Sequence, residues 1–147
     1  MKEISEAQLF LAKARRTLDG ALASAQEVFN EAEAIAQEAH DEVEDLIWQA
    51  FDEVSAPAFQ AFSAAIDPFF MASEAGCPRK DFDNALARAR PIKDEALAAP
   101  RQTRDEGLAR AQEALDEAIA PNLLAFEIAT TVAWQAYLNT ITKRGIL

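Results

Sequence analysis

The sequence predicts an all-α protein, an elongated antiparallel helical bundle or hairpin in which two long, partly kinked helical arms are joined by a short phenylalanine-rich helical segment. Good helix formers, mainly alanine, glutamate, glutamine and leucine, dominate residues 5–54, and no proline interrupts them. Apolar residues recur at helical spacing. The 147 residues include 33 alanines but only four glycines, and no Gly/Ser-rich linker. We therefore expect a single helical domain over residues 1–147.

The first arm is predicted over about residues 5–55. Ser5 and Gln8 have capping-box spacing, which predicts a helix start at that point. Apolar residues seven apart then form two alanine-rich columns, which let a partner helix approach closely. Both a coiled coil and an ordinary amphipathic core helix fit this pattern. The columns are Leu11, Leu18, Ala25, Ala32, Ala39 and Leu46, and Leu22, Phe29, Ala36, Val43 and Ala50.

A second period, of eleven residues, competes with the heptads. Polar residues recur at this spacing in both halves of the chain. An eleven-residue repeat gives 3.67 residues per turn, which is typical of nearly straight, continuous helix. The register continues past Pro100, so we expect a kinked helix there and not a long loop. The positions are Asp19, Asn30, Asp41 and Asp52, and then Asp83, Asp94, Asp105 and Asp116.

The connecting segment is predicted over about residues 56–78, where Pro57, Pro68 and Pro78 punctuate the chain. Five of the nine phenylalanines lie between residues 51 and 70. Several apolar residues recur there at three- and four-residue spacing, on one face of a short helix. This face is either core or an exposed anchor for a partner or another copy. Its residues are Phe59, Phe62, Ile66, Phe69 and Phe70.

The second arm is predicted over about residues 79–144, and it resembles the first at an offset of 86 residues. The run from Trp48 to Phe51 (WQAF) corresponds to the run from Trp134 to Tyr137 (WQAY). Either two related helices or the alanine-rich composition explains the match. Because Trp48, Trp134 and Tyr137 lie at corresponding places, we expect them to share a packing or interface role.

One apolar stretch, residues 123–142, has the length of a membrane span. It contains Glu127, Gln135 and Asn139, and a charge near the bilayer centre is costly. We therefore expect no membrane association and interpret the stretch as a helix buried on most sides, in a bundle or an oligomer. Residues 1–6 lack the apolar region of a signal peptide, so a cytoplasmic location is expected.

Acidic residues are concentrated in one part of the chain. The net charge is −11, and residues 17–78 contain 13 acidic and no basic side chains, whereas residues 79–110 contain eight basic and six acidic ones. This balance argues against nucleic-acid binding. An acidic surface is expected beside His40, either solvated or meeting a protein partner with a basic surface. Its residues are Glu38, Asp41, Glu42, Glu44 and Asp45.

Catalytic, metal and cofactor sites are not expected. The chain has one histidine and one cysteine, which excludes a ferritin-like di-iron centre built from two Glu-x-x-His motifs. It also lacks a glycine-rich phosphate loop and a serine elbow. The sequence therefore predicts a protein that is not an enzyme.

Three functions remain as hypotheses. The first is a structural or interaction protein that self-associates, with a dimer favoured, or binds a protein partner through its alanine-rich columns. The second is an amphipathic protein of lipid or granule surfaces, because the eleven-residue spacing, alanine content and clustered phenylalanines are similar to those of apolipoprotein-like proteins and phasins. The third is an acidic inhibitor that mimics nucleic acid. No motif identifies a family.

Overall fold

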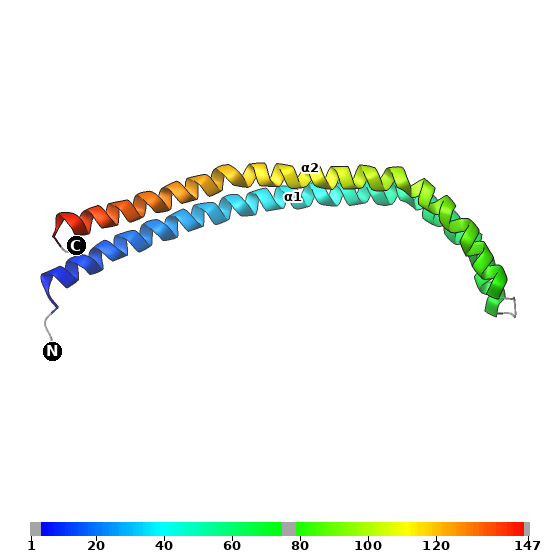
Figure 1. The fold of residues 1–147 in the computed structure, drawn as a ribbon, viewed down its shortest axis with the longest axis horizontal. Coiled ribbons are helices and arrows are strands. Elements are labelled where there is room, and N and C mark those ends of the chain that lie inside the picture. The colour runs from blue at the N-terminus through cyan, green and yellow to red at the C-terminus, as the bar shows by residue number, and fades with distance from the viewer. Residues whose placement is uncertain (1–3, 75–78, 146–147) are drawn as a thin grey trace. The chain divides into compact units, whose positions relative to one another are not determined.

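The computed structural model describes the backbone of residues 4–74 and 79–145, and the side chains of residues 4–70 and 79–145. Over these residues the chain forms two helices, α1 (Glu6–Glu74) and α2 (Arg79–Lys143), with no strand (Figure 1). The all-α prediction is confirmed. A search of the described residues finds no helical segment long and apolar enough to cross a membrane.

The start of α1 is capped as the sequence predicts. The Ser5 backbone N–H donates to Gln8 Oε1 at 3.0 Å, and the Gln8 N–H donates to Ser5 Oγ at 3.2 Å. These reciprocal bonds satisfy two backbone donors that have no partner within the helix. At the other end, Gly145 follows α2 with φ of +72°, and its N–H donates to the Thr142 carbonyl at 3.0 Å. Glycine adopts this left-handed conformation without a Cβ clash, so it ends the helix.

The two helices contribute to two compact units. Unit 1 consists of Met1–Ala39 and Ala114–Leu147, and unit 2 consists of His40–Glu113. In unit 1, Phe29 contacts Phe126 and Arg144 lies over Phe10. In unit 2, Phe70 contacts Phe82 and residues earlier in α1 contact residues later in α2. Each unit is therefore a pair of antiparallel helices.

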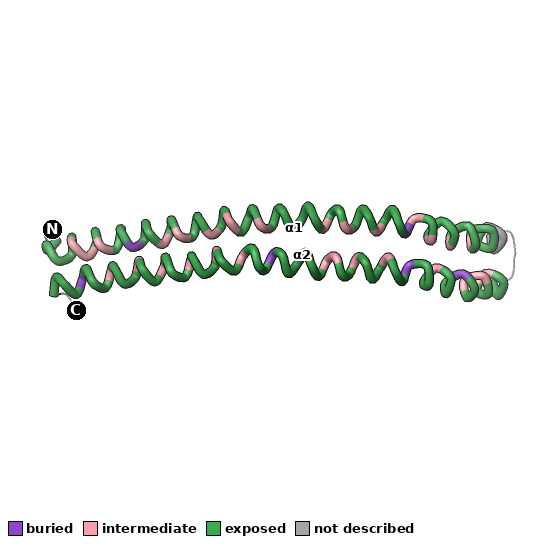
Figure 2. Tube along the Cα trace, turned by 90° about the horizontal axis from the view of Figure 1, so that it is seen from above, coloured by how far each residue is buried: buried purple, intermediate pink, exposed green. Residues whose placement is uncertain are grey.

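Burial along α2 follows the eleven-residue period. One column of large residues is buried or half-buried, while the aspartates at the same spacing are all exposed (Figure 2). The seven-residue columns do not hold beyond residue 36, since Ala39 is exposed and Val43 and Leu46 are 45% and 64% exposed. At 3.6 residues per turn a seven-residue column drifts by roughly 3° per residue, whereas an eleven-residue column drifts by only about 2° per residue in the opposite sense, so it keeps its side of the helix over a longer stretch. The buried column is Leu86, Leu97, Leu108, Ile119, Thr130 and Ile141.

The predicted connecting segment is not separate from the first arm. Helix α1 continues through Pro57 and Pro68 to Glu74, so residues 56–74 belong to it, and residues 75–78 lie outside the described part. Likewise α2 continues through Pro100. A proline within a helix costs roughly 3 kcal/mol because it removes one backbone hydrogen bond. Packing of the flanking residues within each unit outweighs that cost, which local pattern alone does not reveal.

Few side chains are fully covered. Leu97 and Ser55 have no exposed surface, and the other buried apolar residues are spread over the two units. Two paired helices can cover only the sides that face each other, so their remaining sides stay in water. The apolar residues on those sides are therefore the candidates for function. The other buried apolar residues are Leu18, Ala89, Ala111, Leu115 and Ile141.

Candidate functional site

A groove between α1 and α2 of unit 1 is the largest apolar concavity described here, with a volume of about 670 Å³. Six of its lining residues are alanines, whose small side chains leave the groove open. Phe29 and Phe126 lie in it with ring centroids 5.4 Å apart. No charged residue lines it. The lining residues are Ala21, Ser24, Ala25, Val28, Phe29, Asn122, Ala125, Phe126, Ala129, Val132, Ala133 and Ala136.

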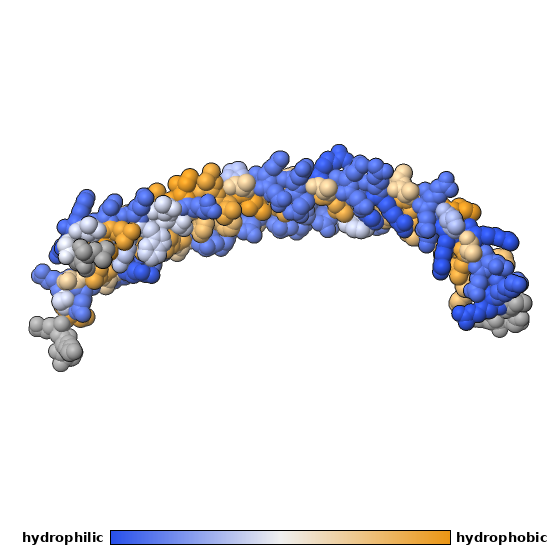
Figure 3. Space-filling view, in the orientation of Figure 1, coloured by the Kyte–Doolittle hydropathy of each residue, from blue (hydrophilic) through white to orange (hydrophobic). Residues whose placement is uncertain are grey.

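Large apolar side chains stand exposed at and beside this groove. Val28 is 66% exposed on α1, and Val132 is 57% exposed on α2. Leu124 and Ile128 are 57% and 55% exposed, at four-residue steps that continue to Val132. Figure 3 shows apolar surface gathered over α2 of unit 1. We call Val28, Leu124, Ile128 and Val132 the unit 1 apolar face.

The stretch from 123 to 142 accounts for this exposure. The sequence predicts a helix buried on most sides, in a bundle or an oligomer, but α1 covers it on only one side in this chain. Each of its six large exposed apolar residues keeps between 41% and 57% of its surface in water. A helix that is apolar nearly all round is normally buried nearly all round. The exposed residues are Leu123, Leu124, Ile128, Val132, Trp134 and Leu138.

A second groove in unit 1, of about 430 Å³, adjoins the first and shares Ala21, Ala133 and Ala136 with it. Its lining includes Tyr137 and two cations, Lys13 and Arg144. The apolar concavity therefore continues along the pair of helices and becomes charged near their ends.

Each unit holds a tryptophan, a second aromatic ring and an arginine in contact. In unit 1, Trp134 and Tyr137 lie 6.0 Å apart at 87°, and Arg15 lies 5.6 Å from the Trp134 ring. Arg15 also pairs with Asp19 at 3.3 Å. The guanidinium is thus held between a carboxylate and an aromatic face, which is a favourable place for a cation.

In unit 2, Trp48 and Phe51 lie 5.9 Å apart, again at 87°. Arg104 lies 5.1 Å from the Trp48 ring and 4.6 Å from the Phe51 ring, and its Nε donates to Asp105 Oδ1 at 2.9 Å. The two tryptophans are 40% and 41% exposed. The residues that the sequence matched at an offset of 86 therefore have matching geometry.

The same offset relates two grooves. A groove of about 380 Å³ in unit 2 is lined by ten residues, and nine of their positions, moved by 86, line the 430 Å³ groove of unit 1. The residues that line the two grooves differ, however. Gly107 and Ile47 stand where unit 1 has Ala21 and Ala133, and Arg104 stands where unit 1 has Leu18. The duplication stays a prediction, with this correspondence as its support.

The phenylalanine-rich face predicted as an interface is divided by the structure. Phe59, Phe69 and Phe70 are 44%, 38% and 58% exposed, whereas Phe62 and Ile66 are half-buried. Lys93 Nζ lies 4.2 Å from the centroid of the Phe62 ring, so this ring packs against α2. Trp48 and Trp134 are exposed, and Tyr137 is half-buried.

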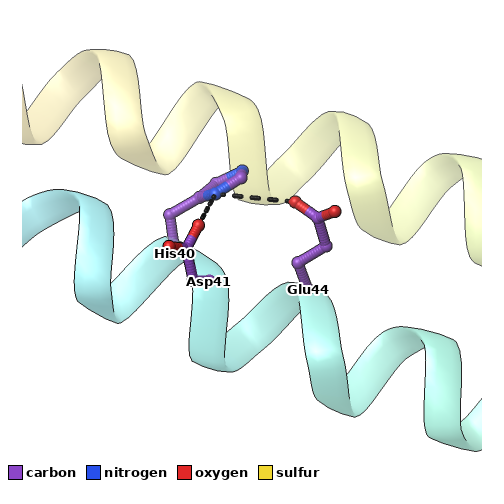
Figure 4. Close-up of side chains that lie close together, drawn as sticks. All are labelled: His40, Asp41 and Glu44. Carbon is purple, nitrogen blue, oxygen red and sulfur yellow. Dashed lines mark hydrogen bonds and ion pairs between the residues drawn. The ribbon is translucent and has the colours of Figure 1, made fainter.

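The predicted acidic surface is largely exposed. Glu38, Asp41, Glu42 and Asp45 are exposed, and Glu44 is half-buried. His40 Nδ1 lies 3.4 Å from Asp41 Oδ1 and 3.7 Å from Glu44 Oε2, as Figure 4 shows.

One imidazole and two carboxylates form a ligand set that a divalent cation accepts, and their donor atoms lie within 4.8 Å of one another. The same contacts form without a metal, because Nδ1 lies within reach of both carboxylates. His40 also lies eleven residues from Phe29 and from Phe51, two residues that face α2 within their units. The period therefore explains why only 11% of the His40 side chain is exposed, and packing is the simpler role.

Comparison with known proteins returns no match to a family model, a curated protein or a solved structure. The functional argument therefore depends on the surface itself. Sequence reasoning missed Val28, Leu124, Ile128 and Val132 as site residues. The apolar stretch 123–142 is the signal that identifies them, because it contains more apolar residues than one neighbouring helix can cover.

Proposed function

We propose that this protein is a non-enzymatic helical interaction protein that self-associates or binds a protein partner, and that the unit 1 apolar face is its docking surface. One observation carries the proposal: Val28 and Val132 line an uncharged groove and are each more than half exposed, and Leu124 and Ile128, at four-residue steps before Val132, are more than half exposed as well. Burying such side chains contributes roughly 25 cal/mol per Å² of apolar surface. A contiguous apolar surface of this kind marks an interaction site in a soluble domain.

The shape of the groove suits the binding of a partner helix. Alanine walls let a helix axis approach near the lower end of the usual range of roughly 8–10 Å. The exposed Val28 and Val132 stand on the two helices that form the groove, one on each side. An amphipathic helix with anchors at three- and four-residue spacing fits such a surface.

Of the alternative functions, the lipid- or granule-surface hypothesis has some support in the exposed Phe59, Phe69 and Phe70 of unit 2. These phenylalanines lie on α1, where residues 17–78 contain no lysine or arginine, so this helix lacks the basic flank of interfacial helices and the cations of unit 2 all come from α2. The acidic-inhibitor hypothesis depends on the 13 acidic residues between positions 17 and 78. The unit 1 apolar face has no role in that second alternative, which is why docking is favoured.

A labelling experiment tests the docking surface. Two variants in a Cys77→Ser background each carry one new thiol, Ile128→Cys in unit 1 and Ile92→Cys in unit 2. Both isoleucines lie on α2 and are exposed, by 55% and 69%. Thiol-labelling rates are measured in dilute purified protein, in concentrated protein and in extract of the native cells.

We expect the thiol at position 128 to be protected in concentrated protein or in extract, while the thiol at position 92 keeps its dilute rate. Equal, unprotected rates at both positions in all three conditions would overturn the proposed function.

A further inference from the structure

We infer that the unit 1 apolar face is covered by unit 1 of a second copy of this chain, so that four helices pack together in an isologous dimer. This inference rests on the proposed function and names its partner. Surface area and the distribution of charge support it.

The chain exposes far more surface than its mass requires. Its accessible surface is 10903 Å² for 16.1 kDa. A compact monomer of that mass exposes roughly 7,400 Å². A standard protein interface covers roughly 800 Å² on each partner. The excess, summed over both units, is larger than the area that one such interface covers on each partner.

The charge of the face suits a second copy. Residues 128–142 contain no aspartate, glutamate, lysine or arginine. In an isologous dimer the same patch lies on both sides of the interface, so a charge near the twofold axis would lie close to its own copy. The groove lining and residues 128–142 avoid that repulsion, and the nearest charge on α2 is the exposed Glu127 before Ile128. The groove lining and residues 128–142 also offer no charge to attract a basic protein or an acidic one, whereas electrostatic complementarity is what selects an unlike partner.

A lipid surface fits less well. Residues 114–142 of α2 contain no lysine or arginine, and the cations of unit 1 that line a groove, Lys13 and Arg144, lie near the helix ends. The chain carries a net charge of −11. Interfacial helices usually place basic residues on their polar side, where they meet anionic lipids. A protein surface is therefore a more favourable partner than a lipid surface for the exposed apolar residues of unit 1.

Unit 2 provides the contrast. Its part of α1 carries Asp41, Glu42, Asp45 and Asp52 on exposed positions, and its part of α2 is rich in cations. Bringing this surface against itself would remove many charged side chains from water, which is costly unless each of them is paired. The structure thus assigns self-association to unit 1, and a matched pair of variants can separate the two units.

The test compares Ile128→Glu in unit 1 with Ile92→Glu in unit 2, using sedimentation velocity of the full chain from low to high micromolar concentration. Helicity by circular dichroism confirms that each variant folds, and Ile128→Gln serves if the glutamate variant does not. We expect the parent chain and Ile92→Glu to dimerise alike. Ile128→Glu should weaken dimerisation by at least about tenfold, because each interface then buries two unpaired carboxylates.

Two results would overturn the inference. One is a parent chain that stays monomeric throughout, and the other is a dimer that Ile92→Glu weakens and Ile128→Glu does not. The labelling experiment then separates this failure from that of the proposed function. Protection of the thiol at position 128 only in cell extract, with a monomeric purified chain, would leave docking intact and assign the face to a different protein.

Discussion

Phe29 of α1 and Phe126 of α2 pack with ring centroids 5.4 Å apart and planes tilted by 41°, and both rings lie in the unit 1 groove. This contact joins the two helices within the groove that Val28 and Val132 also line. A tilted aromatic pair contributes beyond its buried area because the ring edges are positive and the faces negative. The stability of the groove therefore depends on the two rings together.

A double-mutant cycle measures this contact. Phe29→Leu and Phe126→Leu, alone and combined, are compared by urea unfolding. We expect a coupling energy of about 0.5–1.5 kcal/mol between the two rings. Additive losses would mean that each ring contributes only its own burial.

The glycines at 20 and 107 predict opposite outcomes for the same change. A Cβ at Gly20 would meet no heavy atom within 4 Å, whereas one at Gly107 would lie 3.3 Å from Ile47 Cδ1. Gly20→Ala should raise the free energy of unfolding by about 1 kcal/mol, since alanine is the better helix former. Gly107→Ala should gain clearly less, because Ile47 must shift. Equal gains in thermal unfolding would show that Ile47 moves without cost.

Ser55 is buried, and its hydroxyl has no hydrogen-bond partner in the structure. Removing a buried group of this kind leaves nothing unsatisfied, so Ser55→Ala should leave stability unchanged or raise it by up to about 1 kcal/mol. Leu97→Ala, at an equally buried position of the same unit, should lose about 2–5 kcal/mol. A large loss for Ser55→Ala would reveal a hydroxyl contact that the structure lacks.

Arg104 connects the helices of unit 2 by lying over two rings at once. Arg104→Met keeps the length of the side chain but removes its charge, and we expect it to cost about 1 kcal/mol. Arg90→Met, on an exposed position of the same helix, is the control and should change stability by less than about 0.5 kcal/mol. Equal effects of the two changes in urea unfolding would argue against a cation–π contribution.

The fold was predictable where a periodic signal was long. The eleven-residue spacing of Asp83, Asp94, Asp105 and Asp116 places all four on the exposed side of α2. The capping box at Ser5 is likewise local, and it forms as expected. The proline segment was not predictable, because continuation of α1 through Pro57 and Pro68 depends on packing within unit 2 and not on the residues beside each proline.

The candidate site was predictable only in part. The sequence showed that residues 123–142 are apolar nearly all round, but spacing along one helix cannot tell which sides a neighbour covers. Only the position of α1 shows that Ile128 and Val132 stay in water. The clustering of phenylalanines predicts a core face or an interface. Phe62 packs against Lys93 and so contributes to the interior of its unit.

The most direct test of the account is the mass of the unmodified chain in solution, measured by sedimentation equilibrium over a wide range of concentration. The chain has a mass of 16.1 kDa. If unit 1 of one copy covers unit 1 of another, the mass should rise with concentration to twice that value and stop there, as closed twofold symmetry requires. A mass that stays at that of one chain at every concentration, or that rises without limit, would contradict it.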